Sequence, residues 1–119
     1  MKYLLLINTD EKLWDSVAPA EQERVIGEHF ALAEELRRRG QLIAGEALQP
    51  VSTAVTVRIV EGRSVVTDGP FAETKEQIGG FYFIEARDLN EALAIAARIP
   101  QPGSGSVEVR PILTFPGGD

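Results

Sequence analysis

The segment Lys2-Tyr3-Leu4-Leu5-Leu6-Ile7-Asn8 decides the fold, because it is apolar on both sides of an extended strand. Side chains alternate between the two faces of a strand, so the odd-numbered residues share one face while Leu4 and Leu6 share the other. The segment Phe81-Tyr82-Phe83-Ile84 has the same property. Both segments are therefore predicted to be strands that are buried on both faces.

Two amphipathic helices are predicted around these strands. The first begins at Pro19, which suits the first position of a helix, and ends near Gly40, which suits a C-terminal cap. Apolar residues recur at helical spacing between these limits, and arginines precede Gly40 where they complement the negative helix end. The second helix is predicted to begin after the capping residue Asp88 and to stop before Pro100.

Further strands complete the predicted architecture. They are expected at residues 41–48, 53–60, 64–67, 80–86 and 107–110, with a hairpin turn at Glu61-Gly62. This order predicts an α+β fold of the ferredoxin-like, split βαβ type with an extra β-hairpin. A single domain is expected over residues 1–115, and residues 116–119 are expected to form a frayed tail.

Two helices can cover only one face of the predicted sheet, whereas its central strands are apolar on both. The second face therefore needs a cover, and another copy of the chain is the simplest one. A homodimer with its sheets packed face to face is predicted.

Composition limits the classes of function. The chain has 119 residues, of which 44% are hydrophobic, and a net charge of −6, which argues against binding of nucleic acid. No stretch is long enough to span a membrane, so no membrane partner is expected. With no cysteine and one histidine, neither a thiol nucleophile nor a transition-metal site is expected. A cytoplasmic enzyme or binding protein fits this composition.

The long polar connection from Asp68 to Gly80 is predicted to be a binding loop, because connections between strands are usually short. Phe71 is expected to anchor this loop in the core. Thr74 and Lys75 could offer a hydroxyl and a cation to an anionic ligand, or they could belong to a solvated surface run. Arg58 could hold a substrate carboxylate, or it could form an ion pair with Asp68 or Glu108.

The stretch Asp68-Gly69-Pro70-Phe71-Ala72-Glu73-Thr74-Lys75-Glu76, followed by Gly79-Gly80-Phe81-Tyr82, resembles the signature of the DGPF group of YCII-related proteins. The similarity extends through residues 1–7, 44–46, 56–58 and 107–111 and so covers nearly the whole chain. It implies a dimeric α+β barrel of ferredoxin-like protomers. It also implies kinship with small-molecule lyases and isomerases, and a link to extracytoplasmic-function sigma factors.

The resemblance also implies a role for His29, because the wider superfamily carries a histidine on its first helix that is proposed to act with an aspartate. Asp68 and Asp10 are the two candidates for this partner. From the residues alone, a core or helix-edge histidine is the favoured interpretation of His29, and Asp68 could serve only to hydrogen-bond its own turn.

Three functions are compatible with these observations. The first is a cofactor-independent lyase or isomerase in which His29 moves a proton on a small acidic substrate. The second is a regulatory module that contacts a protein linked to a sigma factor. The third is a structural dimer with a vestigial pocket.

Overall fold

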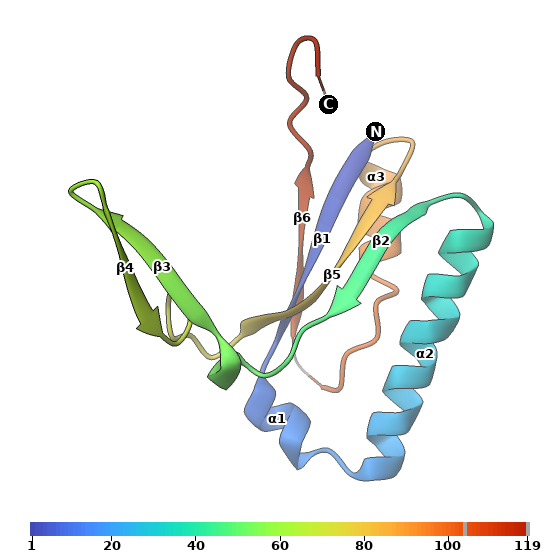
Figure 1. The fold of residues 1–119 in the computed structure, drawn as a ribbon. Helices are drawn as coiled ribbons and strands as arrows, with labels where there is room; N and C mark the ends of the chain where they lie inside the picture. The colour runs from blue at the N-terminus through green and yellow to red at the C-terminus, as the bar shows by residue number, and fades with distance from the viewer. Residues whose placement is uncertain (104, 119) are drawn as a thin grey trace.

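The computed structural model describes residues 1–103 and 105–118 and confirms the ferredoxin-like α+β fold. Its main sheet is antiparallel, in the order β2-β5-β1-β6 (Figure 1). The four strands are β1 (Lys2–Thr9), β2 (Leu42–Ala47), β5 (Gln77–Glu85) and β6 (Ser106–Pro111). The helices are α1 (Glu11–Ser16), α2 (Pro19–Arg38) and α3 (Leu89–Ala96), and a 3₁₀ turn, η1, spans Val51–Thr53.

Helix α2 begins and ends where the sequence predicts. Pro19 occupies its first position, arginines lie in its last turn, and Gly40 follows with a φ of 72° that favours glycine. The short helix α1 was not predicted. Asp10 caps it, since its carboxylate accepts hydrogen bonds from the backbone N–H groups of Lys12 at 3.1 Å and Leu13 at 3.2 Å.

One face of the sheet carries the core. Side chains from this face pack with residues of α2 and α3 in a single buried cluster, which includes Tyr3, Leu5, Tyr82, Ile84, Leu32, Leu36 and Ile95. The opposite face carries Leu4 and Leu6, which pair with Phe83 and Phe81 respectively. These four side chains remain half-buried, and we call this surface the open face. The helices therefore cover one face only, as predicted.

The predicted extra hairpin forms a separate two-stranded sheet of β3 (Val55–Val60) and β4 (Arg63–Asp68). It projects away from the main sheet as an arm (Figure 1). Val57, Ile59 and Val66 share one face of this arm and are 59%, 71% and 63% exposed. The arm therefore exposes an apolar face in addition to the open face of the main sheet.

The C-terminal strand is tied closely to the main sheet. The N–H of Ile112 donates to the carbonyl of Lys2 at 3.0 Å, so β6 is held to β1 as far as its last residue. A frayed tail was expected at residues 116–119. Residues 116–118 lie beyond the last strand, and Asp119 lies outside the described residues.

In the part of the chain that is described, none of the helices has both the length and the apolar character to cross a bilayer.

Candidate functional site

His29 lies on α2 and is paired with Tyr82 of β5. Its Nδ1 is 3.1 Å from the Tyr82 hydroxyl, and that hydroxyl also lies 3.4 Å from the backbone carbonyl of His29. The two rings meet edge-on, with centroids 6.3 Å apart. His29 is half-buried and Tyr82 is 7% exposed, so the pair joins the helix to the core-bearing face of the sheet.

Burial controls the protonation of this pair. It lowers the pKa of His29, although a hydrogen bond to the Pro100 backbone and the charge of Glu28 act in the opposite direction. Burial also raises the pKa of Tyr82. Both groups are therefore neutral at neutral pH, and a neutral imidazole is able to accept a proton.

Neither candidate aspartate contacts His29. Asp10 caps α1, and Asp68 ends β4 opposite Val55 with its side chain exposed. The hydrogen bonds among the described residues give His29 a tyrosine as its side-chain partner instead of a carboxylate. Tyr82 was not predicted as a site residue. Its position in a mainly apolar strand, on the face that also carries Ile84, is the signal that could have pointed to it.

Arg58 holds the loop, but not through an ion pair. It donates to the Thr67 hydroxyl at 3.2 Å and to the Phe71 carbonyl at 3.3 Å, and its guanidinium lies 6.0 Å from the Phe71 ring centroid. The predicted ion pair with Asp68 or Glu108 is wrong, because the described residues give Arg58 no carboxylate partner. Arg58 is exposed on the arm, where water solvates its guanidinium and a carboxylate partner is not required.

The expectation that Phe71 anchors the loop in the core is also wrong. Its side chain is 82% exposed, because the loop leaves the arm and crosses outside the main core before β5 begins. Hydrogen bonds from Gln77 fix the loop instead. Its Nε2 donates to the carbonyls of Ala72 at 3.0 Å and Thr74 at 3.1 Å.

A cavity of about 590 Å³ lies where this loop meets the end of the sheet and the segment around η1. We call it the loop pocket. Its lining is partly apolar and partly polar, and it comprises Asn8, Leu48, Gln49, Pro50, Val51, Thr53, Ala54, Pro70, Phe71, Ala72, Thr74, Glu76, Gln77 and Ile78. Among these described residues Glu76 is the charged one, and its carboxylate accepts a hydrogen bond from the Ser106 hydroxyl at 2.8 Å.

The structure thus brings together only part of the predicted site. Phe71 and Thr74 line the loop pocket, and Arg58 reaches it through its bond to Phe71. Lys75 lies between two lining residues in the sequence and Asp68 lies two residues before Pro70, but neither lines the pocket. His29 is not among the lining residues, because it faces the core-bearing side of the sheet with Tyr82.

Comparison with known proteins assigns the chain to a protein family. The YCII-related domain matches residues 1–116. The chain belongs to the YCII-related family. One relative of this YCII-related protein is an uncharacterized protein, R00369, of Rhizobium meliloti (strain 1021). It is 38% identical over 121 residues, which cover 100% of this chain and 98% of that protein.

Proposed function

We propose that this YCII-related protein binds a small molecule in the loop pocket. The observation that carries this proposal is the pocket itself, whose volume of about 590 Å³ lies within the range of ligand sites. Its walls combine apolar side chains such as Leu48 and Ile78 with hydrogen-bonding groups such as Asn8 and Gln49. That mixture is typical of sites that bury an apolar ligand body and orient it by a few polar contacts.

The proposed ligand is a small anion, and its charge has to be met by the loop and not by the pocket walls. Glu76 would repel an anion placed beside it. Arg58 on β3 keeps donors beyond its two hydrogen bonds, one of which reaches the lining residue Phe71. Lys75 lies between the lining residues Thr74 and Glu76 in the sequence, so these two cations are the ones proposed to meet the ligand charge. The DGPF-like stretch spans this loop, and it supports the proposal that the chain belongs to the DGPF group.

Binding is tested by thermal shift and by NMR titration with a panel of small carboxylates and matched neutral amides. We expect amide shifts confined to the loop pocket. The Thr74 hydroxyl donates to the Glu76 carbonyl and accepts from Gln77 Nε2 at 3.2 Å, so it holds the loop that lines the pocket. Thr74→Val removes both bonds and should weaken binding about tenfold. The matched control is Thr114→Val, which lies outside the pocket lining and should leave binding unchanged. Equal binding by wild type and Thr74→Val would contradict this placement of the ligand.

The finer proposal is a cofactor-independent lyase or isomerase in which His29 takes a proton from the ligand. The neutral state of the His29 imidazole supports this role. The pair of His29 and Tyr82 does not line the loop pocket, so the reaction requires the ligand to reach the core-bearing side of the sheet. Asp68 would then act on the loop and not as the partner of His29.

Proton abstraction can be tested without knowledge of the product. A ligand found by the titration is incubated with the protein in D₂O, and exchange of its C–H protons is followed by NMR. We expect exchange with wild type and none with His29→Gln. Unchanged exchange in that variant would eliminate His29 as the base, while the binding result would stand.

The second candidate function is a regulatory module that contacts a protein linked to a sigma factor. The exposed apolar face of the arm, with Val57, Ile59 and Val66, supports a protein contact, and the net charge of −6 would favour a basic partner. Co-purification of the wild-type protein with a sigma factor, together with loss of that complex in Val57→Asp, would support this candidate. Retention of the complex in Val57→Asp would count against the arm as its contact.

The proposed homodimer is supported by the size of the protomer surface. A compact monomer of this length has a radius of gyration of about 14 Å, whereas this protomer has 16.3 Å. Its accessible surface is 8255 Å², about 1,900 Å² more than a compact monomer exposes. A standard interface buries about 800 Å² per partner. The excess is therefore enough for a stable dimer that covers the open face and the arm.

Sedimentation velocity tests the dimer. Wild type is expected to sediment as a dimer, and Phe83→Glu on the open face as a monomer that circular dichroism shows to be folded. Phe30→Glu is the matched control, because Phe30 is 72% exposed on α2 and lies outside the open face. A monomeric wild type at high concentration would overturn the proposal.

A further inference from the structure

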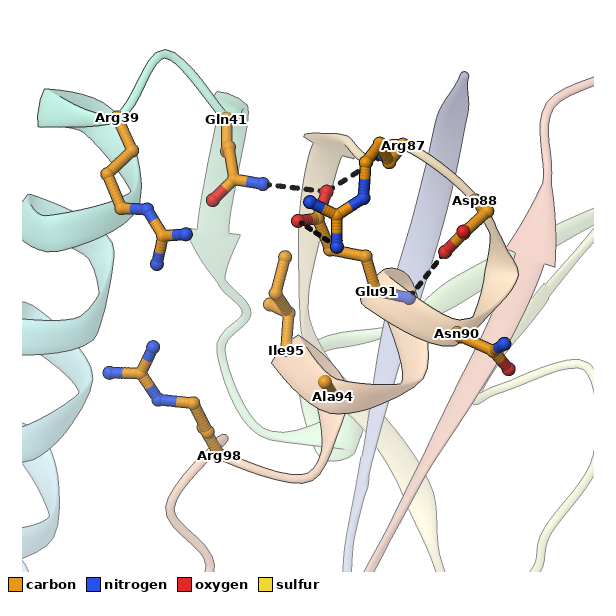
Figure 2. A pocket seen from close by; sticks show the side chains of 9 residues that line it. All are labelled: Arg39, Gln41, Arg87, Asp88, Asn90, Glu91, Ala94, Ile95 and Arg98. Carbon is orange, nitrogen blue, oxygen red and sulfur yellow. Dashed lines mark hydrogen bonds and ion pairs between the residues drawn. The ribbon is translucent and has the colours of Figure 1, made fainter.

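A second cavity lies between the C-terminal end of α2 and helix α3, and none of its residues lines the loop pocket. Its volume is about 460 Å³. We call it the arginine cleft because three guanidinium groups surround it (Figure 2). Its lining comprises Arg39, Gln41, Arg87, Asp88, Asn90, Glu91, Ala94, Ile95 and Arg98.

Gln41 presents an unsatisfied acceptor in this cleft. Its Nε2 donates to Glu91 Oε1 at 3.2 Å, and its Oε1 is buried without a hydrogen-bond partner among the described residues. Rotating the amide by half a turn would not help, because it would place the Gln41 oxygen against the Glu91 carboxylate. The orientation of the amide is therefore fixed, and its oxygen has no hydrogen-bond donor among the described residues.

Glu91 is itself fully engaged, which explains why Gln41 is held so firmly. Its Oε1 also accepts a hydrogen bond from the backbone N–H of Arg87 at 2.8 Å, and its Oε2 lies 3.4 Å from the Arg87 guanidinium. The Glu91 side chain is only 17% exposed. The acceptor on Gln41 is thus part of a rigid arrangement and not of a mobile surface side chain.

Arg39 and Arg98 both keep guanidinium N–H donors that form no hydrogen bond within the described part of the protein. Arg98 forms two bonds of 2.7 Å to the Glu35 carboxylate and lowers the pKa of Glu35 to about 2, so Glu35 stays ionised. Arg39 uses a single nitrogen on Glu35, at 3.3 Å. Figure 2 shows the Gln41 oxygen directed to the side of the cleft on which Arg39 and Arg98 lie. An acceptor that needs a donor therefore lies beside cations that can bind a carboxylate.

We propose that the arginine cleft binds a small α-amino acid. The ligand carboxylate would lie against Arg39 and Arg98, and its side chain would lie along Ala94 and Ile95. Its ammonium group would donate to Gln41 Oε1 once the side chains that bury this oxygen move aside. Three arginines face three carboxylates here, those of Glu35, Asp88 and Glu91, so a neutral zwitterion leaves the charge balanced. A simple anion would satisfy the arginines but would leave Gln41 without a donor.

The test compares L-leucine with 4-methylpentanoate, which has the same carboxylate and alkyl chain but no ammonium group. Both are titrated into the full-length protein and followed by amide NMR. We expect L-leucine to bind about tenfold more tightly, with shifts confined to residues 39–41 and 87–98. Gln41→Leu should abolish this preference, because it replaces the amide acceptor with an apolar side chain of similar size.

A matched pair of arginine variants completes the experiment. Arg39→Gln should weaken binding of both compounds, whereas Arg37→Gln should not, because Arg37 pairs with Glu34 outside the cleft. Absence of shifts with L-leucine at millimolar concentration would overturn the proposal. A preference for L-leucine that survives in Gln41→Leu would overturn it as well.

Discussion

Replacement of Gly80 by alanine should destabilise the main sheet, because the site has no room for a methyl group. A Cβ built on Gly80 would lie 2.9 Å from the carbonyl oxygen of Glu46 and 3.4 Å from the Cα of Ala47. Both atoms belong to the backbone of β2, which pairs with β5 at this point, so neither can move without distorting the ladder. Overpacking of this kind costs about 1–3 kcal/mol of unfolding free energy.

Gly27→Ala is the control for this prediction. Gly27 lies in the middle of α2, and a Cβ built there meets nothing within 4 Å. Alanine should therefore stabilise the protein by about 0.5–1 kcal/mol through helix propensity. Urea denaturation of both variants measures the difference. A Gly80→Ala variant as stable as wild type would refute the close approach of β2 and β5 described above.

Two further predictions concern His29 and Asp10. Because the pKa of His29 is lowered in the folded protein, the unfolded chain binds its proton more readily, so stability is lost as the pH falls below about 6.5. His29→Gln should reduce this loss in thermal denaturation between about pH 7 and 5, and an unchanged pH profile would contradict burial of the imidazole. Asp10→Ala should cost about 0.5–2 kcal/mol as a lost helix cap without moving the NMR-titrated pKa of His29, and a moved pKa would reinstate Asp10 as its partner.

Much of the fold could be predicted because the signals are local and redundant. Pro19 and Gly40 mark the ends of α2 by their backbone preferences, and Asp88 marks the start of α3 as an acceptor for a free N–H group. Helix α1 was missed because six residues are too few to show a helical period. Its cap, Asp10, was visible in the sequence but was considered only as one of two candidate partners of His29.

The site was harder to predict, because it depends on which distant residues meet. The sequence singled out His29, but its contact with Tyr82 joins residues 53 positions apart and follows only from the packing of α2 on the sheet. The loop was found because its composition is unusual for a connection. The cavity beside it also needs Leu48 and Pro50, which no local pattern connects to that loop.

The error over Phe71 concerns an aromatic side chain that was expected in the core. In the structure, which is that of a single chain, Phe71 and the apolar face of the arm are exposed. Burying such a surface against a second copy would restore the agreement between sequence and environment without changing the fold. In the proposed homodimer Phe71 would then become less exposed together with Val57 and Ile59. A dimer that leaves all three as accessible to solvent as the protomer does would show that this explanation is wrong.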